Sequence, residues 1–308
     1  EGEIAPGDIL NLADTTLLRP LPGRKPGPGW PVHPHADIHE ASWMISRTES
    51  LSLRGDKERM EIEERQKAHY DRLACAYAEC YSDRFCVAYR EKFIHNPMAG
   101  NLDLNGLAVL EAMCGSGQST EYLLRRGAKV TGLDISRVQV GMLKAKFPRC
   151  GAVCGSILQA GFPGSAFDCI FLLGGLHHLH PRVDAAIDEI HRILKPGGHF
   201  CFVEPHAGSL PDFLRRMWYR WDNFFERNEK AIDLEELLAK NSGRFEFIKT
   251  QYVGNVAYAF VFQSSVMRIP FWMKRFYASL LLSFESSISG FQGKRLSCAV
   301  ICQWKKIP

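Results

Sequence analysis

A glycine turn between a predicted strand and a predicted helix constrains the fold of this chain more than any other feature. The apolar run Leu107–Met113 has the length of a buried strand, and Gly115 and Gly117 follow it. A helical period over 118–126 comes next. A strand that opens through glycines into a helix is typical of a βαβ unit with parallel strands. The sequence therefore predicts an α/β protein with a ligand crevice at the carboxyl ends of its strands.

The same alternation continues along the middle of the chain. It places four further strands at 129–133, 151–154, 167–173 and 199–204. Pro181 suits the first turn of the helix before the last of these strands, and Lys195–Gly198 is predicted to turn the chain into that strand. Near the C-terminus, 244–252 and 296–304 alternate as two more strands.

Composition shifts divide the chain into three parts. Residues 1–53 are predicted to be a Pro/Gly-rich N-terminal arm, because seven of the 16 prolines precede residue 35. Residues 54–104 are predicted to form an N-terminal helical lid. Residues 105–308 are the predicted core, with helical inserts at about 207–240 and 254–295.

Charge and hydropathy exclude several classes of protein. The net charge of +4 is too small to indicate a nucleic-acid partner. The longest uninterrupted apolar run, Val256–Phe262, is far shorter than the ~20 residues of a membrane-spanning helix. The hydrophobic fraction of 46% is that of a globular protein, which excludes a wholly disordered chain.

Two residue types that bind metals are present without the pattern of a metal site. The ten cysteines contain no Cys-x-x-Cys pair, and several lie in apolar runs, which predicts reduced thiols and a cytoplasmic protein. His33, His35 and His39 lie in the Pro-rich arm, where an imidazole cluster is a weak signal. No metal is predicted.

The residues around the glycine turn suit a cationic ligand with a ribose. Asp134 ends the second predicted strand, where a carboxylate is placed to accept two ribose hydroxyls. The run 115–120 lacks the third glycine of a dinucleotide site, which argues against a nicotinamide enzyme. Glu111 and Cys114 crowd the turn instead, and a carboxylate there repels a pyrophosphate.

Several motifs together resemble the class I S-adenosylmethionine-dependent methyltransferases. The resemblance covers about 67–205 and is carried by Glu111–Gly117, Gly132–Ser136, Phe167–Phe171, Leu176–Leu179, Leu194–Gly198 and the spacing of Tyr70, Asp71, Ala74 and Tyr77. It points to the small-molecule branch, similar to the methyltransferases of ubiquinone and menaquinone biosynthesis. It implies a Rossmann-like, seven-stranded, mostly parallel sheet with an antiparallel last strand and helices on both faces.

The resemblance also implies a binding site for S-adenosyl-L-methionine as cofactor. Its residues here are Tyr70, Tyr77, Glu111, Cys114, Gly115, Ser116, Gly117, Asp134, Ile135, Ser156, Ile157, Leu173 and Gly174. Asp134 corresponds to the ribose acceptor and the glycine turn to the floor under the methionine part. Two positions depart from the family pattern. Met113 replaces a frequent first glycine, and Ser156 replaces a frequent Asp near the adenine.

A histidine pair follows the fourth predicted strand. His177 or His178 is a candidate base or substrate-orienting group, because an imidazole titrates near neutral pH. A general base is needed only if the acceptor arrives protonated. The competing interpretation is a structural pair whatever the substrate, and His206 is a second candidate.

Segments outside the core indicate the acceptor. Leu172–Gly175 lacks the Asp/Asn-Pro-Pro-Tyr tetrad of enzymes that methylate exocyclic amines of bases. The aromatic run Trp218–Phe225 is compatible with core packing or with a lid over an apolar substrate. Residues 268–291 repeat aromatic residues at three and four beside basic ones, which fits a helix on a membrane surface or one packed on its own domain.

These features favour an enzyme that transfers a methyl group to a small apolar acceptor, quinone-, lipid- or polyketide-like. A nucleic-acid or protein methyltransferase is the alternative, and it predicts a broad basic face around the crevice. A non-catalytic cofactor-binding protein is a further alternative, because Met113 makes the loop bulkier. The acceptor, the methylated atom and the oligomeric state do not follow from the sequence.

Overall fold

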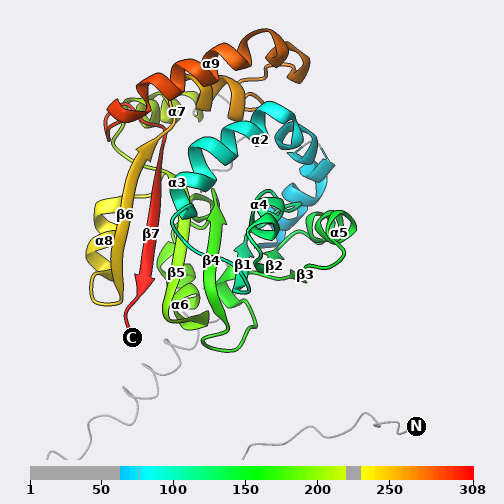
Figure 1. Cartoon of the computed structure of the whole chain (residues 1–308), viewed down its shortest axis with the longest axis vertical. Coiled ribbons are helices and arrows are strands. Elements are labelled where there is room, and N and C mark those ends of the chain that lie inside the picture. Colours follow the sequence, from blue (N-terminus) through cyan, green and yellow to red (C-terminus); the bar gives the residue numbers. More distant parts are fainter. Residues whose placement is uncertain (1–62, 76, 220–229) are drawn as a thin grey trace, which may run out of the picture. The chain divides into compact units, whose positions relative to one another are not determined.

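The computed structural model describes residues 63–75, 77–219 and 230–308, so the predicted arm 1–53 with His33, His35 and His39 lies outside the described residues. Figure 1 shows a central sheet with the strand order β3-β2-β1-β4-β5-β7-β6. Its strands are β1 Ala108–Ala112, β2 Lys129–Asp134, β3 Gly151–Cys154, β4 Phe167–Leu173, β5 Leu194–Pro205, β6 Phe245–Val253 and β7 Ala299–Lys306. β1 to β5 pair in parallel, and β7 runs antiparallel between β5 and β6. The predicted fold class is confirmed.

Helices cover both faces of this sheet. Their bounds are α2 Arg84–Arg90, α3 Asn96–Ala99, α4 Thr120–Arg125, α5 Arg137–Lys146, α6 Val183–Ile193, α7 Leu210–Tyr219, α8 Leu234–Asn241 and α9 Lys274–Ile288, with the short turns η1 Glu91–His95, η2 Ile157–Gln159, η3 Leu176–His178, η4 Tyr258–Phe262, η5 Phe271–Met273 and η6 Ser289–Phe291. Along β4, Cys169 and Phe171 join one buried cluster, and Ile170 and Leu172 join the other. Side chains alternate across a strand, so an uninterrupted apolar strand is buried on both faces.

The fifth strand begins earlier than predicted. β5 starts at Leu194, and Lys195–Gly198 forms a bulge opposite Asp168 rather than a turn before the strand. Gly197 has a φ of +74°, which a glycine adopts readily, and Lys195 Nζ lies 2.7 Å from Asp168 Oδ1. The bulge accommodates the Pro-Gly-Gly residues while the ladder resumes at His199.

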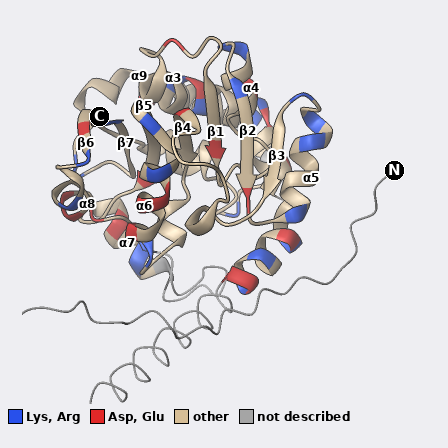
Figure 2. Ribbon diagram, turned by 90° about the horizontal axis from the view of Figure 1, so that it is seen from below, with Lys and Arg blue, Asp and Glu red and all other residues tan. Residues whose placement is uncertain are grey.

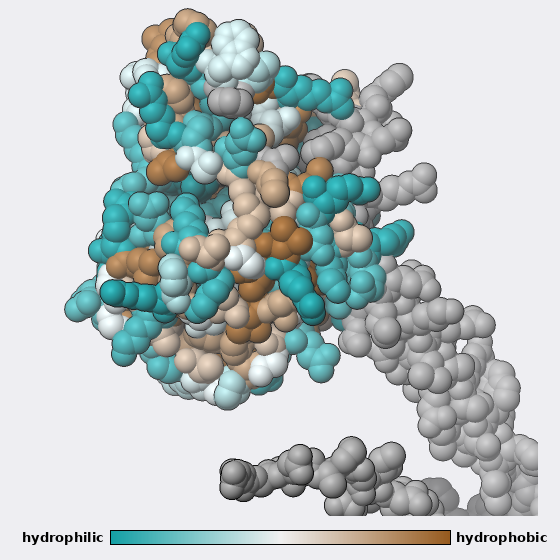
Figure 3. Space-filling model, turned by 90° about the vertical axis from the view of Figure 1, so that its right-hand side faces the viewer, coloured by the Kyte–Doolittle hydropathy of each residue, from teal (hydrophilic) through white to brown (hydrophobic). Residues whose placement is uncertain are grey.

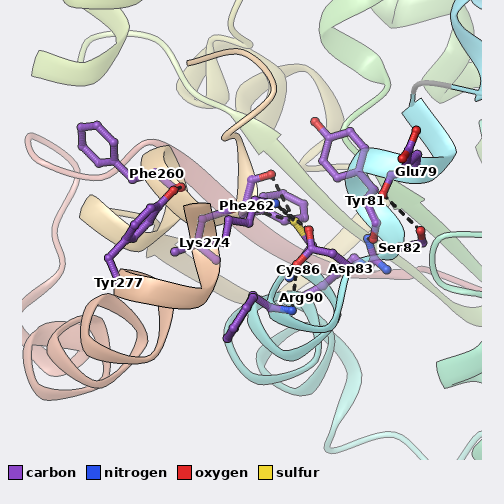
Figure 4. Close-up of polar contacts among 12 residues, drawn as sticks. Glu79, Tyr81, Ser82, Asp83, Cys86, Arg90, Phe260, Phe262, Lys274 and Tyr277 are labelled. Carbon is purple, nitrogen blue, oxygen red and sulfur yellow. Dashed lines mark hydrogen bonds and ion pairs between the residues drawn. The ribbon is translucent and has the colours of Figure 1, made fainter. Parts of the chain in front are cut away.

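The C-terminal insert is anchored to the core by buried charges. Lys274, at the start of α9, has a side chain only 1% exposed, and its Nζ lies 2.6 Å from Asp83 Oδ2 and 3.1 Å from Cys86 Sγ (Figure 4). Glu285 is fully buried and accepts hydrogen bonds from Tyr89 Oη and from backbone N–H groups of 255–258. These contacts fix which edge of α9 faces the protein.

Part of the aromatic run Trp218–Phe225 lies outside the described residues. Trp221, Phe224 and Phe225 belong to 220–229, and only the backbone of Trp218 and Tyr219 is described, as the end of α7. Among the helices of the described residues, none combines the length and apolar character needed to cross a bilayer.

Candidate active site

A cavity of about 610 Å³ lies at the carboxyl ends of β1, β2, β4 and β5. Its volume is in the range of small-molecule sites. Residues of the N-terminal helical segment, of α7 and of 254–267 complete its wall. In Figure 2, acidic positions in red mark the ends of β1 and β2. The cavity occupies the edge of the sheet at which open α/β proteins bind ligands.

Most of the predicted site residues line this cavity. They are Tyr70, Tyr77, Glu111, Cys114, Gly115, Asp134, Ile135, Ser156, Ile157, Leu173, Gly174, His177 and His178. Ser116 and Gly117 are absent from its lining. A Cβ on Gly117 would lie 2.5 Å from Leu143 Cδ1 and 2.8 Å from Thr120 Oγ1. That glycine therefore allows the loop to pack on α5 and on the start of α4, rather than exposing backbone to a ligand.

Asp134 connects the glycine turn to the end of β2. Its Oδ2 accepts a hydrogen bond from Gly115 N at 2.8 Å, and its Oδ1 accepts one from Ser136 N at 2.9 Å. Burial raises the pKa of Asp134, and these two backbone donors oppose the rise. Each carboxylate oxygen keeps a further lone pair, so the oriented group can still accept from ligand hydroxyls.

Met113 has a backbone conformation that usually belongs to glycine. Its φ is +52°, in the left-handed region. Its side chain covers Gly175, where a Cβ would lie 2.5 Å from the Met113 sulfur. The residue lines the cavity without filling it. The Met113 side chain thus packs against Gly175 and leaves the cavity open.

Glu111 lines the cavity, but its carboxylate is engaged within the protein. It accepts hydrogen bonds from Ser119 N at 2.7 Å and from the Thr120 hydroxyl, both at the start of α4. Burial raises the pKa of Glu111 to about 7, although these hydrogen bonds favour the ionised form. The group secures the glycine turn to α4 and is half-protonated near neutral pH.

The raised pKa of Glu111 makes stability depend on pH. A carboxyl group with a higher pKa in the folded state binds its proton more tightly when folded. The free energy of unfolding should therefore fall as pH rises from the usual value of 4.5 towards 7, by up to about 3 kcal/mol. Urea unfolding over this pH range measures the slope. Glu111→Gln should reduce the slope, with part remaining because burial also raises the pKa of Asp134. Glu121→Gln, at an exposed position of α4, should keep it in full. An unchanged slope in Glu111→Gln would contradict this assignment.

His177 is held by a buried carboxylate that the sequence analysis missed. Its Nδ1 lies 2.7 Å from Glu204 Oε2, at the end of β5. Glu204 also accepts from the backbone N–H groups of Gly175 and Leu176 at 2.6 and 2.7 Å. Burial tends to raise the pKa of Glu204, but His177 and these donors outweigh it and keep the pKa below its usual value. An ionised carboxylate only accepts, so Nδ1 carries the proton and Nε2 is left as the basic nitrogen.

His178 and the helical segment 63–75 close one side of the cavity. The Tyr70 hydroxyl lies 3.2 Å from both ring nitrogens of His178, and Gln66 donates to the His178 carbonyl at 2.8 Å. Ser156, whose hydroxyl caps η2, lies 3.2 Å from Glu63. Tyr70 and Tyr77 meet edge to face with ring centroids 6.2 Å apart. The predicted lid thus contacts the ends of β3 and β4.

His206 lines the cavity, but backbone carbonyls surround its ring. Its Nδ1 lies 3.2 Å from the Ala207 oxygen and its Nε2 3.1 Å from the Ser297 oxygen. Burial lowers the pKa of His206, so the neutral ring is favoured. This histidine ties β5 to the segment before β7.

The charge of the cavity wall is mainly acidic. Five acidic residues line it: Glu63, Glu111, Asp134, Glu204 and Asp212. Arg215 is the only lysine or arginine among the described lining residues. Such a wall suits a ligand that carries positive charge and does not suit a phosphate chain. The residues present fit S-adenosylmethionine, a sulfonium with a ribose.

Comparison with known proteins identifies the central part of the chain. Residues 110–202 match the family described as "Methyltransferase domain". This central part of the chain therefore resembles a methyltransferase domain.

Two curated relatives are similar to this chain over its central part. An uncharacterized methyltransferase of Synechocystis is 36% identical over 124 residues, which is 40% of this chain and 58% of that protein. A fatty-acid O-methyltransferase of Mycolicibacterium smegmatis is 32% identical over 129 residues, 40% of this chain and 47% of the relative. The chain thus spans about half the length of these relatives.

A solved methyltransferase shares the fold. A methyltransferase structure from Thermotoga maritima superposes with a TM-score of 0.52 at 16% identity, covering 78% of this chain and 99% of that one.

Proposed function

We propose that this protein transfers a methyl group from S-adenosylmethionine to a small apolar acceptor, quinone-, lipid- or polyketide-like. The proposal depends on the cavity wall, which has an acidic part and an apolar part. Acidic strand ends line one part of it, and the apolar side chains of Leu214, Val256, Phe260, Phe262, Val266, Met267 and Leu296 line another. An apolar pocket excludes water and favours an acceptor without charge. The similarity to a fatty-acid methyltransferase supports this class of acceptor.

The acidic part of the cavity wall would hold S-adenosylmethionine. S-adenosylmethionine supplies a methyl group on a sulfonium, which is already a good leaving group. Asp134 would accept the ribose hydroxyls, with Gly115 beside it and Ser156 near the adenine. Tyr70 and Tyr77 line the same cavity, and an aromatic face beside the sulfonium would stabilise it by about 0.5–2 kcal/mol. The enzyme's main task is then to align an acceptor atom with the methyl group and to exclude water.

His177 is proposed as the general base for an acceptor that arrives protonated. Glu204 orients its ring and leaves Nε2 basic, as in other carboxylate–histidine pairs. The His178 ring contacts the Tyr70 hydroxyl of the helical segment at 3.2 Å. We therefore assign the base to His177 and a positioning role on the lid to His178.

The residues of the cavity wall argue against a nucleic-acid methyltransferase and against a non-catalytic binding protein. A nucleic-acid methyltransferase needs cations for phosphates, and Arg215 alone supplies one among the described lining residues. A binding protein with a blocked acceptor pocket would have this space filled by its own side chains, yet the cavity holds about 610 Å³. An apolar acceptor also partitions into lipid, so peripheral membrane contact through 268–291 is part of the proposal.

A methyl-transfer screen tests the proposed function. The protein is incubated with S-adenosylmethionine labelled in the methyl group and with separate lipid, polar small-molecule, RNA and protein pools. Label should enter the lipid extract, because only apolar acceptors fill the apolar part of the cavity. His177→Gln is the inactivating variant and should lower that transfer where the acceptor arrives protonated. Label in RNA or protein, with none in the lipid extract, would refute the acceptor class.

A further inference from the structure

Exposed apolar side chains are concentrated in one part of the described chain. Thirteen of its seventeen exposed large hydrophobic residues belong to α7 or to 256–296. Phe291, Leu280 and Phe276 are 90%, 72% and 69% exposed. The two segments meet, because Leu210 N at the start of α7 donates to the Arg295 oxygen at 2.9 Å. Hydrophobic surface, in brown, is visible in Figure 3 at the upper end, where α9 lies in Figure 1. Contiguous surfaces of this kind mark sites of interaction.

Buried charged residues fix the orientation of α9 and therefore determine which of its side chains face outward. Lys274 and Glu285 point into the protein and hold the helix by the contacts of Figure 4 and by those to Tyr89. Trp272, Phe276, Leu280 and Phe284 recur at a spacing of four and are all exposed. The outward side of α9 therefore carries an apolar stripe that none of the described residues covers.

Charge on this part of the chain is one-sided. In 265–296, Arg268, Arg275 and Arg295 are exposed, whereas Lys274 is buried against Asp83 and Lys294 pairs with Glu235 of α8. The one acid of this segment, Glu285, is buried. The guanidinium of Arg275 lies 4.6 Å from the ring centroid of Phe276 and 6.0 Å from that of Trp272, within the apolar stripe. Arg295 is exposed next to Leu296. An apolar stripe with exposed arginines beside it is complementary to an anionic lipid surface.

The same surface contains the mouth of the cavity. Leu214, Val256, Phe260 and Leu296 line the cavity and are also exposed. They come from α7, from the segment around η4 and from the chain before β7. An acceptor dissolved in lipid therefore meets the mouth without crossing water.

We propose that α7, η4 and α9 form a docking face for a bilayer with anionic headgroups, and that the cavity opens to the lipid at the centre of this face. The inference rests on the proposed function for the acceptor, but the docking itself is measured without one. The docking face is defined by Leu210, Phe213, Leu214, Met217, Val256, Phe260, Trp272, Met273, Phe276, Leu280, Phe284, Phe291 and Leu296.

Co-sedimentation of the full chain with vesicles tests the docking face. The chain should bind vesicles of phosphatidylcholine with phosphatidylglycerol, and bind more weakly to phosphatidylcholine alone or at high salt. Phe276→Ser with Leu280→Ser should weaken binding at least about tenfold, because two large apolar side chains no longer enter the lipid. Leu296→Asp, at the mouth, should weaken it as well. Leu124→Ser with Val138→Ser, at exposed positions on α4 and α5, is the matched control and should bind like the unchanged chain.

Two further measurements distinguish a membrane-docking face from a dimer interface and from a failure of the proposed function. Titration calorimetry with S-adenosylhomocysteine should give the same affinity for the unchanged chain and for Phe276→Ser with Leu280→Ser. If the unchanged chain does not bind S-adenosylhomocysteine, the proposed function is contradicted, but the vesicle result still applies to the docking face. Sedimentation velocity reports the oligomeric state. Failure of the unchanged chain to bind anionic vesicles, equal binding by the double variant, or a dimer that this variant dissociates would each overturn the docking proposal.

Discussion

Asp134→Ala is expected to weaken the binding of S-adenosylhomocysteine by roughly a hundredfold or more. The carboxylate is held by Gly115 N and Ser136 N and lies in the cavity wall, where two ribose hydroxyls would donate to it. A hydrogen bond to a charged group contributes about 1.5–3 kcal/mol, so the loss of two corresponds to at least about 3 kcal/mol. That free energy equals roughly a hundredfold change in the dissociation constant. Titration calorimetry measures it directly, without any acceptor.

A second aspartate of the same sheet provides the control. Asp168 lies near the start of β4, at the opposite edge, and its carboxylate accepts from Ala108 N and Lys195 Nζ. Asp168→Ala should lower the free energy of unfolding and leave the affinity for S-adenosylhomocysteine unchanged. Equal affinities for Asp134→Ala and the unchanged chain would refute the ribose assignment. A similar loss in both variants would point to damage of the sheet as a whole.

The sheet could be predicted from the sequence because burial on both faces leaves a simple pattern. β4 is apolar at every position from Cys169 to Leu173, and two buried clusters account for the alternate residues. Boundaries were less predictable. α4 begins at Thr120 because residues 114–118 are occupied by turn hydrogen bonds such as Gly117 N to the Cys114 oxygen. Such local bonds compete with the first helical turn and leave no mark in hydropathy.

Most residues that strand ends and glycines predict for the cofactor side line the cavity, but Ser116 and Gly117 do not. The resemblance assigned Ser116 and Gly117 to the ligand because they belong to the motif. In the fold, Gly117 instead faces Leu143 and Thr120. A motif identifies the turn, but the direction of each residue depends on the helix that packs against it.

Glu204 shows where sequence reasoning stopped short. The rule that identified Asp134, an acid at the carboxyl end of a parallel strand, applies equally to Glu204 at the end of β5. The apolar wall was less accessible to prediction. Segment 256–267 reaches the cavity through distant contacts, such as the Tyr81 hydroxyl to Gln263 Oε1 at 2.7 Å. No pattern in one sequence reports a pairing between residues so far apart.

His177→Gln is expected to lower kcat by about 10²–10⁴-fold with the acceptor that the pool assay yields, if that acceptor donates a proton. The variant removes the basic Nε2 and the pair with Glu204. His178→Gln should reduce kcat much less, because its ring contacts Tyr70 on the lid. Affinity for S-adenosylhomocysteine should persist in His177→Gln, which separates loss of the base from loss of the fold. A larger defect in His178→Gln would reverse the assignment.

Glu204→Gln distinguishes a base oriented by a carboxylate from a histidine that merely packs there. Glu204 accepts through both oxygens, Oε1 from Gly175 N and Leu176 N and Oε2 from His177 Nδ1. A glutamine presents an NH₂ group to one of these donors, and its neutral amide no longer stabilises an imidazolium. The acid limb of the pH–rate profile should therefore move to lower pH while kcat falls. A purely structural role lowers stability without moving that limb, so the position of the limb decides whether His177 takes the proton.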